Sequence, residues 1–339
     1  MQHSLKKNGF FMISYLIRRI LYAIPILIGV NFITFALFFM VNSPDDMARM
    51  HLGQKHVTQI EITNWEVSHG LDQPLFYNSQ GSIIQQFSHT LFFTESVKLF
   101  TLHFGRSDNG RDISHDITQR MWPSLALAIP TLLIGLAVNI TFALFIALFR
   151  ATFFDTFSMM LCVIMMSISG LFYIILGQFL LGKLLNFVPI SGYQNGLSAI
   201  KFLILPVIVG VIGGIGAGTR WYRAIFLEEM QKDYVRTARS KGLSEIAVLF
   251  KHVLKNALLP ILTGVVVIIP MLFMGSLIME SFFGIPGLGS YTIEAIQQQD
   301  FSIVRAMVFL GTVFYIIGLI LTDFSYVLAD PRINLKARD

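Results

Sequence analysis

The chain has 339 residues, of which 54% are hydrophobic and only 13% are charged. Because a soluble globular domain carries about 25% charged residues, this composition favours an integral membrane protein. The net charge of +5 does not indicate nucleic-acid binding, because the basic residues gather at the ends of long apolar stretches. With Cys162 as its single cysteine, the chain cannot form an intramolecular disulfide, and it gives no sign of a redox compartment.

Six uncharged stretches reach or approach the roughly 20 residues that a helix needs to cross a bilayer. They lie between Arg19 and Asp45, Arg120 and Arg150, Asp155 and Lys183, Lys201 and Arg220, Lys255 and Glu280, and Arg305 and Asp323. The first stretch is too long for the apolar core of a signal peptide and contains no cleavage site of small residues. We therefore predict an all-α integral membrane protein with six transmembrane helices.

The distribution of Lys and Arg between the loops predicts how these helices are oriented, because cytoplasmic loops are enriched in both residues. If the N-terminus is cytoplasmic, 16 of the 25 Lys and Arg residues fall on the cytoplasmic side. The short loops on the opposite side then hold only Lys183, Lys201 and Arg305. We expect both termini in the cytoplasm.

The polar segment 44–120 separates the first helix, within residues 1–43, from a five-helix core at residues 121–339. Its apolar stretches alternate with turn signals, which predicts a partly helical cap over the external mouth. Six of the eight histidines lie in this segment: His51, His56, His69, His89, His103 and His115. Their spacing matches no familiar set of metal ligands, so we expect loop histidines rather than a metal site.

The basic segment 224–260 has the pattern of two short amphipathic helices joined at a glycine. In its first half, 224–241, one face carries Leu227, Met230, Tyr234 and Ala238. Gly242 stands where a left-handed glycine commonly ends a helix, and Ser244 is a typical cap for the next one. The second half repeats apolar residues at helical spacing, namely Ile246, Leu249, Phe250, Val253, Leu254 and Ala257.

Two interpretations of this hairpin, residues 224–260, follow from the residues alone. A basic amphipathic helix beside a membrane can lie on the anionic leaflet. A surface anchor needs no break at a glycine, however, whereas a compact knob that fits into a partner's cleft does. The break favours a docking element, in which the second amphipathic half packs on the chain's own helices.

Residues 233–243 (DYVRTARSKGL) resemble the EAA coupling loop of bacterial ABC importer permeases, in the form of the dipeptide, oligopeptide and nickel branch. Five further segments resemble motifs of that branch and follow in the same order. They are 15–25 (YLIRRILYAIP), 103–107 (HFGRS), 256–260 (NALLP), 280–289 (ESFFGIPGLG) and 323–333 (DFSYVLADPRI). The general loop pattern has Glu at the position of Arg236 and Pro at the position of Lys255. The branch departs from the general pattern at the same two positions. His103 replaces an aspartate of the branch.

This resemblance implies a non-catalytic permease subunit of an ATP-driven importer in a bacterial inner membrane. It also implies a second homologous permease, two ATP-binding subunits that hold ATP and Mg²⁺, and a periplasmic or lipid-anchored substrate-binding protein. This chain itself would bind no cofactor and no metal. Peptides are the expected cargo, with nickel or another small solute as the alternative. The residues expected to couple to the ATPase are Asp233, Tyr234, Val235, Arg236, Thr237, Ala238, Lys241, Gly242 and Leu243.

Glu280 and Asp323 are acidic residues at the ends of predicted spans, where a carboxylate is costly and is a functional candidate. For Asp323 we favour a structural role. For Glu280 we favour the positioning of the loop 282–289 over a proton relay. The candidates for an outer loop or gate are Glu280, Phe283, Pro286, Gly287 and Gly289.

Two other classes of protein fit the sequence less well. A self-sufficient secondary transporter or channel is expected to show charges at the middle of its spans and inverted repeats, and neither is visible. A membrane enzyme would need a catalytic cluster of His, Asp or Ser. Residues 210–218 (GVIGGIGAG) lack the Gly-Lys-Ser/Thr ending of a phosphate-binding loop, so any ATP would be bound by another polypeptide.

Overall fold

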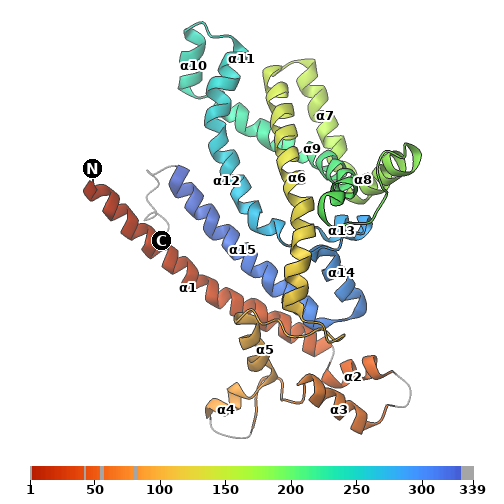
Figure 1. Cartoon of the computed structure of the whole chain (residues 1–339). Helices are drawn as coiled ribbons and strands as arrows, with labels where there is room; N and C mark the ends of the chain where they lie inside the picture. Colours follow the sequence, from red (N-terminus) through yellow and green to blue (C-terminus); the bar gives the residue numbers. More distant parts are fainter. Residues whose placement is uncertain (1, 42, 54–56, 80–82, 330–339) are drawn as a thin grey trace. The chain divides into compact units, whose positions relative to one another are not determined.

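The computed structural model describes residues 2–41, 43–53, 57–79 and 83–329, and this part of the chain is mainly helical (Figure 1). Within these ranges, extended pairing is limited to an isolated bridge between Arg106 and Asp112. The all-α membrane fold expected from the sequence is confirmed. The chain divides into two compact units, Met1–Thr118 with Glu294–Ile316, and Gln119–Ile293 with Ile317–Asp339.

The first unit contains a long helix followed by four short ones. These are α1 Gln2–Val41, α2 Pro44–Leu52, α3 Gln59–His69, α4 Ile83–Ser88 and α5 Leu91–Phe100. Ser43 caps α2 and Thr58 caps α3, each within a reciprocal capping box that satisfies two backbone donors. These local signals explain why the polar segment 44–120 is partly helical.

The short helices are fastened to α1 by aromatic packing and by one buried hydrogen bond. Phe35 of α1 is buried and packs edge-on against Phe92 of α5, with ring centroids 5.2 Å apart. Asn31 donates from Nδ2 to the hydroxyl of Ser96 at 2.6 Å, and both side chains are buried. A polar pair satisfied in this way fixes the register of α5 against α1.

The second unit holds the longer helices and the hairpin. Its elements are most of α6 Ile113–Leu148, α7 Phe153–Ser167, α8 Gly170–Gly177, a π-helix Gln178–Leu184, a 3₁₀ turn Gly196–Ser198, α9 Ala199–Glu229, α10 Asp233–Ser240, α11 Glu245–Val248, a π-helix Leu249–Val253, α12 Leu254–Leu272, α13 Leu277–Phe283, the start of α14 Leu288–Gln298 and the end of α15 Phe301–Ala329.

Glycines let α9 approach its neighbours closely. A Cβ on Gly216 would lie 2.6 Å from the carbonyl oxygen of Cys162 in α7. A Cβ on Gly218 would lie 2.6 Å from the side chain of Asn139 in α6. Residues 210–218 therefore form a helix-packing surface, as small residues commonly do in membrane helices.

Five described helices are long and apolar enough to cross a membrane: Leu21–Val41, Ile113–Leu148, Gly196–Glu229, Glu245–Leu272 and Phe301–Ser325. The remaining predicted span, the third in chain order between Asp155 and Lys183, is not one straight helix. It is a pair, Phe153–Ser167 and Gly170–Leu184, bent by 89°. Ile168 is extended at this break, and the hydroxyl of Tyr173 donates to the Met165 carbonyl at 2.8 Å, which satisfies a group freed at the helix end.

The hairpin also departs from the predicted continuous helix over 224–241. Helix α9 ends at Glu229, and α10 begins at Asp233 after a tight turn. Lys232 is extended at this turn. The turn redirects the chain so that Met230 and Val235, on either side of it, are both buried in one apolar cluster.

Candidate functional site

The glycine turn of the hairpin is built as the sequence predicted. Gly242 has φ +79°, its N–H donates to the Arg239 carbonyl at 2.9 Å, and the next N–H, of Leu243, donates to the Ala238 carbonyl at 3.5 Å. This is the Schellman arrangement, which requires a left-handed residue. The hydroxyl of Ser244 then accepts from the backbone of Ala247 at 3.4 Å and caps α11.

An apolar seam fastens the hairpin to the ends of the long helices. Val235 and Ala238 from α10, and Val248, Leu249, Val253 and Ala257 from the second half, are buried in one cluster. The same cluster contains Ala143, Leu144 and Ala147 of α6 and Phe226 of α9. The expectation that the second half packs on the chain's own helices is confirmed. The hairpin and these helix ends form one packed body.

Two residues predicted to lie on the buried face are in fact exposed. Ile246 is 59% exposed and Phe250 is 57% exposed, whereas Leu249 and Val253 lie in the cluster. The reason is the π-helical turn Leu249–Val253, in which the Leu254 N–H donates to the carbonyl five residues earlier. In a regular α-helix Ile246 and Phe250 would face the buried cluster. The wider π-turn changes the spacing and rotates them away from it.

The nine candidate coupling residues divide into an inward and an outward set. Val235 and Ala238 are buried, and Tyr234 is half-buried. The exposed members are Asp233, Arg236, Thr237, Lys241, Gly242 and Leu243. The inward residues hold α10 in place, and the outward ones are the groups that another protein can contact.

Tyr234 ties the start of α10 to the end of α9. Its hydroxyl donates to Oε2 of Glu229 at 2.6 Å. Burial, together with this bond to a carboxylate, raises the pKa of Tyr234 to about 12. The hydroxyl therefore stays protonated and remains a donor, which fixes the angle of the turn between the two helices.

Charged pairs brace the exposed face of the hairpin. Arg239 makes a two-pronged contact with Glu245 across the glycine turn, at 2.8 and 3.0 Å. Arg236 and Asp233 lie 3.7 Å apart, with 75% and 96% of their side chains exposed. Exposed pairs of this kind add little stability, so these charges are free to serve recognition.

An ion pair that the sequence analysis did not identify lies next to the hairpin. Arg223 of α9 contacts Asp155 of α7 at 2.7 Å, and Asp155 also accepts from the backbone N–H of Ala151. The pair ties the turn between α6 and α7 to the helix that leads into the hairpin. The sequence shows opposite charges at the ends of two neighbouring spans. It does not show which of these charges pair with each other.

Glu280 organises a second loop in this unit. Its side chain is fully buried, Oε1 accepts from the N–H of Ser276 at 3.1 Å, and Oε2 accepts from the N–H of Ser290 at 3.0 Å. The hydroxyl of Ser124 in α6 also bonds to Glu280 and accepts from the Leu288 N–H at 2.8 Å. The carboxylate thus joins both ends of the loop to α6, which supports a positioning role.

Glycines around Glu280 make room for its carboxylate. A Cβ on Gly275 or Gly287 would collide with the Glu280 side chain, and one on Gly289 would lie 2.6 Å from the Ser276 backbone. Phe283 is buried and its carbonyl accepts from the Gly192 N–H at 2.7 Å, while Pro286 is exposed. Four of the five outer-loop candidates are therefore packed inside the loop, and Pro286 lies at its surface.

Other sequence candidates do not come together as a site. Asp323 is half-buried near the end of α15, and residues 330–333 of the DPRI motif lie outside the described residues. Among the described His, Cys, Asp and Glu residues, no group of three or more is arranged to hold a metal ion.

Comparison with known proteins extends over nearly the whole chain. Residues 139–335 match the binding-protein-dependent transport system inner membrane component, and residues 12–94 match the N-terminal region of such membrane components. A putative peptide transport system permease protein of Brucella abortus (strain 2308) is 32% identical, over 95% of this chain and 99% of that protein.

Two further relatives align over similar lengths. The oligopeptide transport system permease protein AppB of Bacillus subtilis (strain 168) is 29% identical, over 95% of this chain and 100% of AppB. The glutathione transport system permease protein GsiC of Shigella flexneri serotype 5b (strain 8401) is 29% identical, over 96% of this chain and 100% of GsiC. The chain therefore belongs to the family of binding-protein-dependent transport system inner membrane components, the permeases of ABC importers.

Proposed function

We propose that the cargo of this permease is a short peptide. The relatives described above are named as peptide, oligopeptide and glutathione transport permeases, and glutathione is itself a tripeptide. Their alignments run over 95% or more of this chain rather than over one motif. The support for peptides over nickel comes from these names.

We further propose that the hairpin is the attachment point for the ATP-binding subunits. The observation that carries this proposal is its construction, with an apolar seam buried against α6 and α9 and charged residues facing outward. The bias of Lys and Arg supports a cytoplasmic position for the hairpin. Two ATP-binding subunits, which hold ATP and Mg²⁺, would contact Asp233, Arg236, Thr237, Lys241 and Leu243 there.

The packed seam explains how such contact would move the transport pathway. When ATP binding draws the two ATP-binding subunits together, α10 is displaced with them. Because Val235 and Ala238 are buried against α6 and α9, the displacement passes to these helices instead of being absorbed by a loose loop. ATP therefore favours one of two arrangements of the spans. A second homologous permease and a periplasmic or lipid-anchored binding protein complete the importer.

Uptake by the complete importer in liposomes tests both proposals. Labelled dialanine should accumulate only with ATP on the hairpin side, and unlabelled di- and tripeptides should compete whereas Ni²⁺ should not. Competition by Ni²⁺ alone would overturn the peptide assignment.

The docking proposal is tested with Arg236→Glu. Because Arg236 is 75% exposed, the variant should fold with unchanged stability and lose most ATP-driven uptake. Lys251→Glu, an exposed charge reversal in the second half of the hairpin, is the matched control and should retain uptake. Equal uptake by both variants would contradict the proposed contact.

A further inference from the structure

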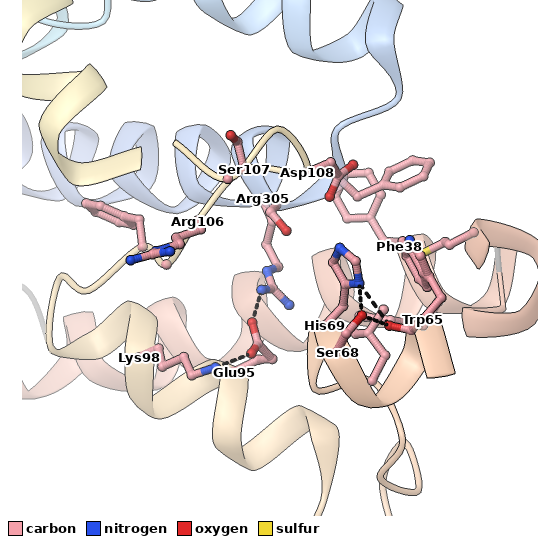
Figure 2. Close-up of a pocket in the computed structure, with 18 residues that line it drawn as sticks. Phe38, Trp65, Ser68, His69, Glu95, Lys98, Arg106, Ser107, Asp108 and Arg305 are labelled. Atoms are coloured by element: carbon pink, nitrogen blue, oxygen red, sulfur yellow. Dashed lines mark hydrogen bonds and ion pairs between the residues drawn. The ribbon is translucent and has the colours of Figure 1, made fainter. Parts of the chain in front are cut away.

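The first unit contains a cavity of about 340 Å³, partly open to solvent, beside the short helices (Figure 2). Its walls come from the end of α1, from α2, α3 and α5, from the loop 104–110 and from the first turns of α15. Small-molecule sites usually measure about 300–1,000 Å³ and combine an apolar lining with a few converging polar groups. The volume suits one or two amino-acid residues and is small for a folded partner.

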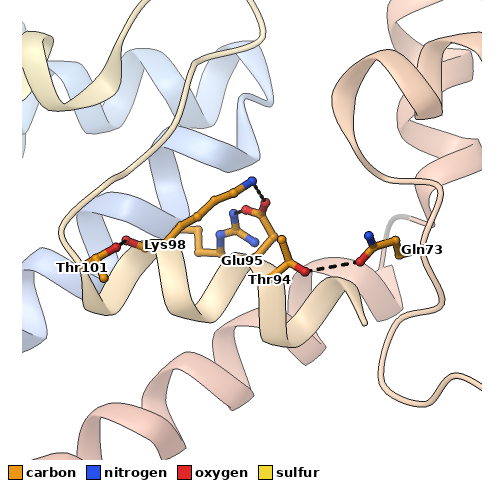
Figure 3. Close-up of polar contacts among 6 residues, drawn as sticks. Gln73, Thr94, Glu95, Lys98 and Thr101 are labelled. Atoms are coloured by element: carbon orange, nitrogen blue, oxygen red, sulfur yellow. Dashed lines mark hydrogen bonds and ion pairs between the residues drawn. The ribbon is translucent and has the colours of Figure 1, made fainter. Parts of the chain in front are cut away.

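One wall of the cavity carries an excess of positive charge. Arg305 is 8% exposed and its Nη2 contacts Oε2 of Glu95 (Figure 2). Lys98 donates to Oε1 of the same carboxylate at 2.7 Å (Figure 3). Two cations thus share one anion. Arg106 and Asp108 also line the cavity and add one charge of each sign.

Arg305 has hydrogen-bonding capacity that this wall does not use. A guanidinium presents five N–H donors in a fixed fork. The Nε of Arg305 is buried and has no hydrogen-bond partner among the residues that the structure describes. Burial raises the pKa of Glu95, but the charges of Arg305 and Lys98 outweigh burial and hold it below its ordinary value, so Glu95 is ionised. Because Arg305 also lines the cavity, an additional carboxylate there would meet positive charge.

The other lining is apolar and aromatic. Phe38, Phe39, Met47 and Leu71 contribute to it. Trp65 stacks on His69 with ring centroids 4.1 Å apart, and Nδ1 of His69 lies 2.8 Å from the Trp65 carbonyl, which fixes the ring. The cavity therefore suits a ligand that has an anionic end and an apolar body.

We propose that this cavity binds a short peptide by its C-terminal residue, with the carboxylate on Arg305 and Lys98 and the side chain against Phe38, Phe39 and Trp65. The assignment of a peptide rests on the proposed function. The site lies outside the hairpin and outside the loop around Glu280, residues 273–290. It would be a cargo-binding site of the permease itself.

The test uses Trp65 as the reporter in the full-length chain held in lipid nanodiscs. The chain has three tryptophans, and replacing Trp122 and Trp221 with Phe leaves Trp65 alone in the cavity. Alanyl-phenylalanine is titrated against its C-terminal amide, which differs by the loss of the carboxylate. The acid should change the Trp65 emission saturably, and the amide should bind about tenfold more weakly or worse, because a charge-assisted hydrogen bond is lost.

Three variants locate the carboxylate. Arg305→Lys keeps the charge but loses the fork and should weaken binding of the acid about tenfold. Lys98→Gln, at a side chain that is 51% exposed, should weaken it about threefold. Glu95→Gln removes the competing anion and should strengthen binding, a direction that a merely structural role would not give.

Equal responses to the acid and the amide would overturn the proposal, and so would the absence of a saturable response. A response to acetate as strong as that to the dipeptide would reduce the cavity to a simple anion site and would also overturn the peptide assignment. Because both ligands are compared on one protein, folding of a variant does not decide the result. Peptide uptake by the complete importer without binding at Trp65 would overturn this site alone and leave the proposed cargo intact.

Discussion

The hairpin and the Glu280 loop, residues 273–290, lie in the same unit but keep their shape by opposite means. In the hairpin one seam of apolar side chains is buried, and the charged side chains of Asp233 and Arg236 are 96% and 75% exposed. In the loop the charged Glu280 is fully buried and is held by backbone N–H groups and a hydroxyl. Another protein can reach the charges of the hairpin but not the carboxylate of the loop.

This difference separates residues that hold a shape from residues that are free to make contacts. Substitutions in the Glu280 loop should change the stability of the fold, because buried polar groups and close backbone contacts leave no room for adjustment. Substitutions of exposed charges on the hairpin should leave stability nearly unchanged and act on coupling instead. The following variants test that division, beginning with the largest expected effect on stability.

Gly289→Ala should damage the loop although it adds only one methyl group. The added methyl would lie 2.6 Å from the Ser276 carbonyl carbon, and backbone atoms cannot move aside as a flexible side chain can. We expect a loss of about 2–3 kcal/mol, measured by thermal unfolding in detergent. Gly214→Ala in α9 is the matched control, because no atom lies within 4 Å of its Cβ position. Equal stability of the two variants would refute the close contact.

The Glu280 carboxyl should make stability depend on pH. Burial is the largest influence and raises its pKa above the ordinary 4.5, although hydrogen bonds from Ser124 and the backbone oppose this. The folded state then holds the proton more tightly than the unfolded state. The contribution of Glu280 to stability is therefore complete below pH 4.5 and declines as the pH rises from 4.5 to the raised pKa.

Two variants test this dependence through unfolding temperatures measured across that window. Glu280→Gln cannot ionise, so its stability relative to the natural chain should improve as the pH rises. Ser124→Ala removes a donor that favours the ionised form, so the decline should extend to higher pH. A pH-independent difference between Glu280→Gln and the natural chain would show that Glu280 does not titrate as described.

Tyr234→Phe tests the joint between α9 and α10. The variant keeps the ring but loses the hydrogen bonds that the hydroxyl makes with Glu229 and Asn256, so we expect a loss of about 1 kcal/mol. Circular dichroism during thermal unfolding measures it. Tyr193→Phe, which removes a hydroxyl elsewhere in the same unit, provides the comparison. If Tyr234→Phe costs no more than Tyr193→Phe, the bond does not hold the joint.

Arg239→Ala should have the smallest effect of the set. Its pair with Glu245 is well aligned but exposed, so we expect a loss of about 0.5 kcal/mol. A double-mutant cycle with Glu245→Ala isolates the coupling energy between the two side chains. A coupling energy of several kcal/mol would mean that the hairpin depends on its surface charges, contrary to the division proposed above.

The parts of this structure that follow from local chemistry were predictable from the sequence. Gly242 and Ser244 are a helix end and a helix cap, and each depends on a few neighbouring residues. The break at Ile168 was not predicted, because apolar content stays high through it. The exposure of Ile246 and Phe250 was missed because helical spacing assumes a regular α-helix, and the π-turn has no sequence signal of its own.

The environment of Glu280 illustrates the limit set by long-range contacts. Its place at the end of a span was evident, and so was the glycine-rich loop after it. The hydroxyl of Ser124, more than 150 residues earlier, was not a predictable partner, because nothing in one sequence pairs the two. The Arg223–Asp155 pair was missed for the same reason.

The central claim, that the outward face of α10 contacts an ATP-binding subunit, is tested most directly by site-specific crosslinking. Cys162 is the single cysteine, so Cys162→Ala gives a background in which Thr237→Cys is the sole thiol. A photoreactive label on this exposed position should capture an ATP-binding subunit in the assembled importer, and the same label on exposed Lys201→Cys should not. Capture from both positions alike, or from neither, would contradict the account.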